Sequence, residues 1–93
     1  MIKSSKELEV GQFVKSRAGR DKERVFIVVE IIDEHYVHVA DGDLRKLEKP
    51  KKKKVKHLNK LDLVSAEVKD KALSDMKLNN ALLRKEVEKA GLI

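Results

Sequence analysis

Four consecutive lysines, Lys51 to Lys54, lie inside a stretch of the chain that is rich in positive charge. From Arg45 to Lys60 there are nine lysines and arginines and a single acidic residue, Glu48, whereas the whole chain has a net charge of only +6. The basic excess is therefore local, and the remainder of the sequence is slightly acidic. A dense basic block predicts a contact surface for a polyanion, for which nucleic acid is the leading candidate.

A second group of basic residues comes earlier in the chain, and it consists of Lys15, Arg17, Arg20, Lys22 and Arg24. Arginine can donate two parallel hydrogen bonds to a phosphate or to a guanine edge, whereas lysine acts as a point charge. We therefore expect the arginines of this group to make oriented contacts and the later segment to supply electrostatic anchoring. The later segment contributes Arg45, Lys46, Lys51, Lys52, Lys53, Lys54 and Lys56. The alternative is a solvated edge whose charges only discourage association between sheets.

The three histidines do not follow a metal-binding pattern. His35 and His38 have an odd spacing, which on a regular strand places two side chains on opposite faces. His57 lies among lysines, where a divalent cation is repelled, so we expect it either to hydrogen-bond a phosphate or base or to cap local backbone. The serines have no neighbouring base in a known motif, and no glycine-rich phosphate loop is present. We therefore predict no metal site, no cofactor, no catalytic residue and no enzyme activity.

Short β-strands are predicted for the first two thirds of the chain, and these must position the basic residues. The predicted strands are residues 11–16, 25–32, 36–40, 44–48 and 61–64. The β-branched run 25–32 is typical of a central strand that is buried on much of both faces. Gly19 is expected to adopt a positive φ in its loop, and Asp41-Gly42 predicts a hairpin turn. Pro50 cannot donate to a ladder and marks an edge or a break, and the spacing of the strands favours a small barrel.

The last third of the chain changes to helical periodicity. Ser65 can cap a helix that begins at Ala66 and carries Val68, Ala72 and Leu73 on one side. A second helix is expected from about Asn80, and its apolar positions are Leu82, Leu83, Val87 and Ala90. Gly91 fits the left-handed position after this helix, and Leu92 is then placed to contact Val87. The apolar stripe is expected to pack on the open side of the barrel, and the alternative is a free tail that binds a partner.

Composition limits the class of protein. A chain of 93 residues with 41% hydrophobic residues is long enough for one folded domain with one modest core. There is no cysteine, which excludes disulfides and thiolate zinc sites. The longest apolar run, Val25 to Ile32, is far shorter than the roughly 20 residues of a membrane helix, and the N-terminus lacks the apolar core of a signal peptide. We expect a soluble, cytoplasmic protein that is a monomer when free.

The loop and its flanking segments resemble the KOW motif. Residues 11–22 read GQFVKSRAGRDK and are followed by the long apolar strand. The string ADGDLRK at residues 40–46, followed by Pro50 with its lysines and by Lys56-His57-Leu58, is similar to the same group. That group is the compact KOW-domain RNA-binding proteins classed with large-subunit ribosomal proteins of the archaeal and eukaryotic type. The resemblance covers roughly residues 8 to 60. Many members have a second glycine where this chain has Glu23 and Arg24, and a side chain there hinders close approach to a backbone.

The resemblance implies an SH3-like barrel whose usual partner is RNA, commonly ribosomal RNA. We therefore expect a mostly β fold with a KOW barrel at residues 1–64, including the basic segment 45–60, and a helical extension at residues 66–93 packed on it. The expected function is binding to the large ribosomal subunit or to another structured RNA through the phosphate backbone, with ribosomal proteins as further neighbours.

The low aromatic content of the chain bears on how RNA would be recognised. Phe13, Phe26 and Tyr36 are the only aromatic residues, and Phe26 is expected in the core. Readers of single-stranded sequence usually stack bases on exposed aromatic rings, so recognition through backbone and shape is favoured. The alternative function is a protein-interaction KOW module in transcription elongation, as in NusG-type factors, or in ribosome-associated regulation.

Overall fold

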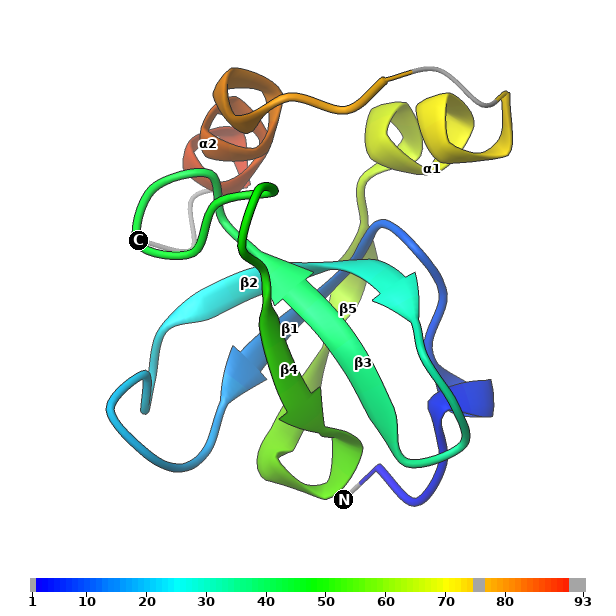
Figure 1. The fold of residues 1–93 in the computed structure, drawn as a ribbon, viewed down its shortest axis with the longest axis vertical. Helices are drawn as coiled ribbons and strands as arrows, with labels where there is room; N and C mark the ends of the chain where they lie inside the picture. Colours follow the sequence, from blue (N-terminus) through cyan, green and yellow to red (C-terminus); the bar gives the residue numbers. More distant parts are fainter. Residues whose placement is uncertain (1, 75–76, 91–93) are drawn as a thin grey trace.

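The computed structural model describes residues 2–74 and 77–90, which form a five-stranded antiparallel sheet with two helices on one side of it (Figure 1). The strands are β1 (Gln12–Ser16), β2 (Val25–Ile31), β3 (Tyr36–Ala40), β4 (Lys51–Lys54) and β5 (Leu58–Val64). The single-turn 3₁₀ helices are η1 (Ser5–Glu7) and η2 (Val55–His57), and the α-helices are α1 (Ala66–Leu73) and α2 (Asn80–Lys89). The prediction of a mostly β chain with C-terminal helices is therefore confirmed.

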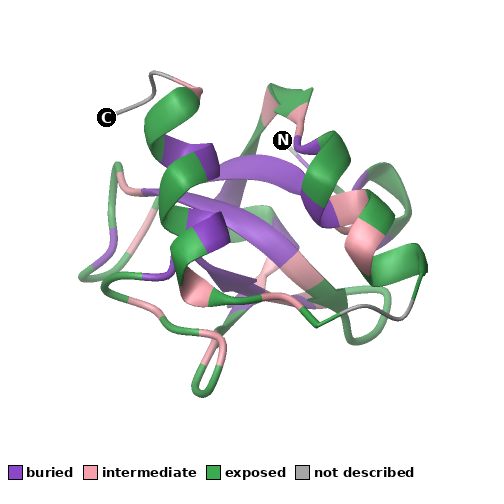
Figure 2. Cartoon of the chain, turned by 90° about the horizontal axis from the view of Figure 1, so that it is seen from above, coloured by how far each residue is buried: buried purple, intermediate pink, exposed green. Residues whose placement is uncertain are grey.

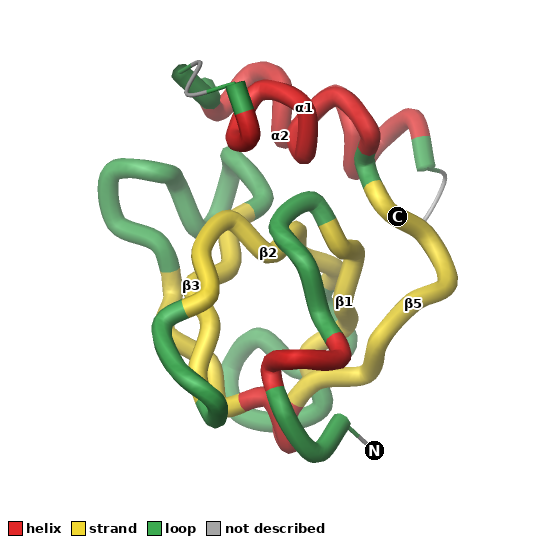
Figure 3. The backbone as a smooth tube through the Cα atoms, turned by 90° about the vertical axis from the view of Figure 1, so that its right-hand side faces the viewer, coloured by secondary structure: helices red, strands yellow, loops and turns green. Residues whose placement is uncertain are grey.

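The strands follow the order β4–β3–β2–β1–β5, so β4 and β5 are the two edges of the sheet. The sheet is strongly curled, as the side view in Figure 3 shows, and η2 connects the end of β4 directly to the start of β5. Two backbone hydrogen bonds hold this connection: Val55 N–H donates to the His35 carbonyl at 2.9 Å, and Arg17 N–H donates to the His57 carbonyl at 2.8 Å. The second bond brings the loop between β1 and β2 to the end of the lysine run.

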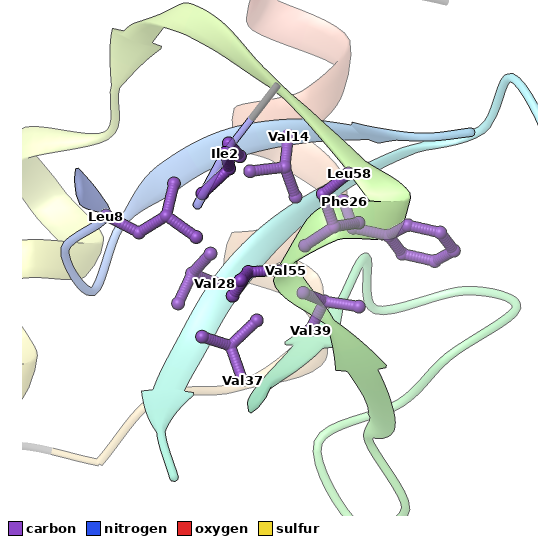
Figure 4. Close-up of a cluster of buried hydrophobic side chains, with 9 residues drawn as sticks. All are labelled: Ile2, Leu8, Val14, Phe26, Val28, Val37, Val39, Val55 and Leu58. Atoms are coloured by element: carbon purple, nitrogen blue, oxygen red, sulfur yellow. The ribbon is translucent and has the colours of Figure 1, made fainter. Parts of the chain in front are cut away.

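One apolar cluster lies inside the curl of the sheet (Figure 4). Its members are Ile2, Leu8, Val14, Phe26, Val28, Val37, Val39, Val55 and Leu58. The strand members alternate along the sequence because successive side chains of a strand point to opposite faces. Phe26 and Val14 are fully buried, as their positions in the sequence predict.

A second apolar cluster fills the space between the sheet and the helices, where the inner side of α2 is buried (Figure 2). Phe13, Val25 and Ile27 from the sheet meet Leu83 and Val87 from α2 in this cluster. The predicted burial of β2 on both faces is therefore correct for its first half, from Val25 to Val28. The second half of β2 is not buried on both faces, since Glu30 and Ile31 are exposed.

Both α-helices begin at the predicted residues, but the apolar side predicted for α1 is only partly buried. The Ser65 side chain accepts a hydrogen bond from Val68 N–H at 3.2 Å, which confirms the predicted cap. Val68 is fully buried, whereas Leu73 is 76% exposed and Ala72 is also exposed. The predicted apolar side is thus wrong beyond Val68, because only the first turn of α1 packs on the sheet. The predicted contact of Gly91 and Leu92 lies outside the described residues.

The predicted strand at residues 44–48 is wrong, and the fourth strand is β4 instead. Asp41 forms a local turn, since its carboxylate accepts hydrogen bonds from Asp43 N–H at 3.0 Å and from Arg45 N–H at 2.9 Å. Leu47 N–H donates to the Asn80 side chain at 2.8 Å rather than to a neighbouring strand. The backbone of this segment is therefore bonded to side chains, and it forms a loop that passes close to α2.

Among residues 2–74 and 77–90, no helix combines the length and the apolar character that crossing a membrane requires.

Candidate nucleic-acid interface

Arg20 of the earlier basic group and most of the later basic segment line a single depression of the surface with a volume of about 440 Å³. We call this depression the basic hollow. Its basic lining residues are Arg20, Arg45, Lys51, Lys52, Lys53, Lys54 and His57, and its other lining residues are Ala18, Gly19, Asp21 and Tyr36. The loop between β1 and β2 forms one wall, and β4 with the end of η2 forms the other. Segments that are 30 residues or more apart in the sequence are thus combined in one positively charged surface.

A buried carboxylate joins the walls of the basic hollow. Asp21 is 3% exposed, and its Oδ2 accepts hydrogen bonds from Arg45 Nη2 at 3.0 Å and from Arg45 Nε at 3.2 Å. The Nζ of Lys53 lies 3.7 Å from the same oxygen. A buried carboxylate is costly unless it is paired, and the two cations compensate the burial of Asp21. The loop, the segment before β4 and β4 itself therefore hold one another in place.

The four lysines of β4 have different surroundings because side chains alternate along a strand. Lys53 is 8% exposed and lies opposite Val37 in the ladder, on the inner side of the sheet. Lys54 and Lys52 point to the other face, which also carries Tyr36. Lys53 therefore supports the fold through Asp21, whereas Lys52 and Lys54 lie on the opposite face of the sheet.

Arg24 is also engaged within the protein. Its Nε donates to Asp41 Oδ2 at 2.8 Å, and its Nη2 lies 3.3 Å from Asp43 Oδ2. The hydrogen bond to Asp41 raises the pKa of the Arg24 guanidinium above its usual value, although burial acts in the opposite direction. This pair links the end of the β1–β2 loop to the turn at Asp41. Lys15 forms a more exposed ion pair with Glu23, at 3.4 Å.

The structure divides the predicted site residues into two sets. Seven of them line the basic hollow: Arg20, Arg45, Lys51, Lys52, Lys53, Lys54 and His57. The others lie outside it: Lys15, Arg17, Lys22, Arg24, Lys46 and Lys56. Within the described part of the chain, Arg20, Lys51, Lys52 and Lys54 line the hollow without forming an ion pair. These four are the cations best placed to meet phosphates.

Tyr36 is a lining residue that the sequence did not reveal as part of the site. Lys52 Nζ lies 4.7 Å from the centre of the Tyr36 ring, and Lys54 Nζ lies 5.9 Å from it, which are cation–π distances. Tyr36 is half-buried and is the register partner of Lys54 in the ladder between β3 and β4. Residues 36–39 pair with the lysine run in the sheet, and this pairing places the Tyr36 ring beside the lysines. A prediction of this strand pairing from the sequence would have identified Tyr36.

The histidines occupy separate places. His38 Nδ1 lies 2.6 Å from Glu30 Oε1 on neighbouring strands, and the carbonyl of His35 accepts the hydrogen bond from Val55. His57 is exposed, and its carbonyl receives the hydrogen bond from Arg17 that links η2 to the loop. Across residues 2–74 and 77–90, no group of three or more histidine or acidic side chains is arranged to hold a metal ion.

A larger depression of about 640 Å³ lies on the other side of the β1–β2 loop, toward α2. Its lining mixes four cations with five acidic residues, which are Arg20, Lys22, Arg24 and Arg84 and Asp21, Glu23, Asp41, Asp43 and Glu88. Acidic groups repel phosphates, so this depression is less suited to a polyanion than the basic hollow.

No protein-family model matches this sequence, and a search of curated proteins gives no match either.

Proposed function

We propose that this protein binds structured RNA through the basic hollow, with ribosomal RNA of the large subunit as the leading target. The observation that carries the proposal is the union of the β1–β2 loop and the lysine strand in one depression, fixed by the carboxylate of Asp21. A solvated edge that only discourages association needs no such arrangement. In this protein Arg24, Arg45 and Lys53 form ion pairs with Asp41 and Asp21. These ion pairs fix the segments that carry the other basic side chains.

The proposed mechanism is phosphate neutralisation by cations that are held in a fixed pattern. Lys51, Lys52 and Lys54 project from an ordered strand rather than from a free tail. Ordering them in advance lowers the entropy that binding would otherwise cost. Arg17 and Arg20 lie on the loop and are exposed, and their guanidinium groups can bind phosphates with two hydrogen bonds. We assign anchoring to the lysines and orientation of the RNA to these arginines.

We further propose that the fold is an SH3-like barrel of the KOW type, as the sequence resemblance implies. Three features support this assignment: the curled five-stranded sheet, the 3₁₀ turn between β4 and β5, and the pairing of β5 with β1. The GQFVKSRAGRDK segment forms β1 and most of the loop that lines the hollow. A role on the large ribosomal subunit also implies that the protein is cytoplasmic.

The direct test is a comparison of two charge-matched variants. The first variant combines Lys51→Ser, Lys52→Ser and Lys54→Ser, which removes three cations of the hollow but keeps Lys53 for the fold. The control combines Lys71→Ser, Lys77→Ser and Lys85→Ser, at positions that do not line the hollow. We expect the first variant to bind fragments of ribosomal RNA at least tenfold more weakly in a titration at low salt, and the control to lose much less.

Equal losses in the two variants would mean that only the overall charge matters, and the site assignment would be abandoned. Absence of binding to ribosomal RNA by the unmodified protein at low salt would overturn the function itself. A sucrose gradient of cell lysate, run with and without ribonuclease, tests the target. Co-migration with large subunits that is lost after ribonuclease treatment supports RNA, whereas association with a protein complex that resists ribonuclease supports a protein partner.

A further inference from the structure

We infer that the basic hollow accepts one unpaired nucleotide of its RNA, with the base stacked on Tyr36 and the adjoining phosphates bound by Lys52, Lys54 and Arg20. This inference rests on the proposed function and adds to it a preference for RNA with an unpaired position. Recognition through backbone and shape alone would not depend on the presence of the unpaired base.

The position of Tyr36 is the first line of support. It is the first residue of β3, and its N–H donates to the Asp33 carboxylate at 2.9 Å while its carbonyl accepts from Ile32 N–H at 3.1 Å. Strand β3 also pairs with β4, and Lys54 of β4 is the register partner of Tyr36. The ring is therefore carried by an ordered backbone at the wall of the hollow, and it is half-buried rather than enclosed in the core.

The cations around the ring are the second line of support. Two ammonium groups lie within 6 Å of the ring centre, at 4.7 Å and 5.9 Å, and Arg20 lines the same hollow. A nucleotide carries its flat base and its charged phosphate close together, so it needs an aromatic face with cations beside it. A base that stacks on Tyr36 displaces an ammonium group from the ring face, and the flexible lysine side chain can follow the phosphate.

The volume of the hollow and the number of accessible aromatic rings limit the site to one stacked base. The volume of about 440 Å³ is within the range of about 300 to 1,000 Å³ that is typical of small-ligand sites. Phe13 and Phe26 are 2% and 0% exposed, so neither can stack on a base, and Tyr36 is the remaining aromatic residue. In a duplex the bases are stacked and paired, and a base must leave the helix to reach an aromatic side chain.

The chain contains one tyrosine and no tryptophan, so the intrinsic tyrosine fluorescence reports on this ring alone. The experiment uses three RNA hairpins with the same stem: one fully paired, one with a single-nucleotide bulge, and one in which the bulged nucleotide lacks its base. We expect the bulged hairpin to quench the fluorescence and to bind about tenfold more tightly than the paired hairpin, because its unpaired base can stack on the tyrosine ring. The hairpin with the abasic bulge is expected to behave like the paired one.

Two variants assign the effect to the ring. Tyr36→Phe keeps the ring and should keep the preference for the bulged hairpin, whereas Tyr36→Leu should lose the preference and bind the bulged and the paired hairpins equally. Should Tyr36→Leu fail to fold in a thermal melt, the abasic hairpin provides the same comparison on the unmodified protein.

Three results would overturn the inference. Equal binding of all three hairpins without quenching would reject base stacking and leave the proposed function standing. An unchanged preference in folded Tyr36→Leu would show that the bulge is recognised elsewhere. Failure of every hairpin to bind at low salt would instead reject the proposed function together with the inference.

Discussion

Adjacent lysines of β4 have different roles because their side chains point to opposite faces of the sheet. Lys53 is turned inward and pairs with Asp21, while Lys52 and Lys54 are turned outward around Tyr36. The period-2 alternation of a strand produces this division. Substitution of all four lysines together would therefore mix a loss of stability with a loss of binding, and Lys53 must be kept when binding is measured.

Gly42 and Gly19 offer a matched pair at the residue scale. Their φ values are 79° and 78°, so an alanine at either position carries the same backbone strain, about 1 to 2 kcal/mol. A Cβ at Gly42 would lie 2.2 Å from the Asn80 carbonyl oxygen, whereas at Gly19 the nearest atom is Lys53 Nζ at 4.0 Å. We expect Gly42→Ala to lower the free energy of unfolding by about 2 kcal/mol more than Gly19→Ala, since overpacking adds to the strain.

Thermal unfolding followed by circular dichroism measures this difference. For a domain of this size, about 1 kcal/mol corresponds to a shift of roughly 4 to 8 °C in the melting temperature. Equal melting temperatures for the two alanine variants would mean that the segment around Gly42 moves away from α2 at little cost.

Glu23 adopts a φ of 72°, a left-handed conformation that glycine adopts without strain. Many members of the KOW family that the sequence resembles have a second glycine where this chain has Glu23 and Arg24, and Glu23 has a conformation that glycine favours although it carries a side chain. We expect Glu23→Gly to be more stable than Glu23→Ala by about 0.5 to 1 kcal/mol, because the alanine keeps the strain that the glycine relieves. Both variants lose the ion pair with Lys15, so that loss cancels in the comparison.

Chemical denaturation of the two Glu23 variants provides the measurement. A Glu23→Ala protein that is as stable as Glu23→Gly would indicate that the loop relaxes to a negative φ when the side chain is shortened.

At the scale of elements, α2 is part of the fold rather than an appendage. Leu83 is fully buried against the sheet, and Arg84 Nη1 donates to the Gly42 carbonyl at 2.6 Å. Asn80 accepts from Leu47 N–H through its Oδ1 and donates to Glu48 Oε1 through its Nδ2, at 2.8 Å and 2.6 Å. The helix therefore also holds the segment that leads to the lysine strand.

Leu83→Ala and Leu73→Ala compare a buried position of α2 with an exposed position of α1. Removal of a fully buried leucine side chain costs about 2 to 5 kcal/mol, whereas a change at a surface position usually costs less than about 0.5 kcal/mol. Because Leu73 is 76% exposed, we expect Leu73→Ala to unfold at nearly the temperature of the unmodified protein and Leu83→Ala to unfold at least about 10 °C lower. Similar melting temperatures for the two variants would show that α2 is dispensable for the fold.

The elements that could be predicted from sequence are those whose pattern is local. Residues 25–31 are mostly β-branched, residues 36–39 alternate in burial, and Ser65 is a capping residue next to a helical period. β4 could not be predicted in this way, because four lysines have no apolar alternation and the strand exists through its pairing with β3. The false strand at residues 44–48 has the opposite cause, since side chains of Asp41 and Asn80 take its backbone donors.

The candidate site was predictable in its charges but not in its internal order. The two basic groups could be read from the sequence, and their meeting was a reasonable hypothesis for a small barrel. The roles of Asp21 and Tyr36 depend on contacts between segments far apart in the chain, to Arg45 and to Lys52 and Lys54. No local pattern marks either residue, so these roles required the structure.

At the scale of the whole molecule, the net charge of +6 understates the charge that a ligand meets. Acidic residues neutralise part of the basic side chains through ion pairs, as at Asp21, Asp41 and Glu23. In the described chain, four cations of the hollow, Arg20, Lys51, Lys52 and Lys54, have no such partner. The electrostatic part of RNA binding is therefore expected to depend on these four residues rather than on the total charge.

The salt dependence of RNA binding measures how many phosphates these cations meet. Each phosphate contact changes the logarithm of affinity by about 0.7 to 0.9 per unit change in the logarithm of salt concentration, because counterions are released. Four contacts from these cations contribute about −2.8 to −3.6 to the slope in titrations from 50 to 200 mM salt. The combined Lys51→Ser, Lys52→Ser and Lys54→Ser variant should reduce the steepness of the slope by about 2 to 3, whereas the Lys71, Lys77 and Lys85 control should leave it nearly unchanged. A slope that is the same in both variants would mean that phosphates are bound elsewhere on the molecule.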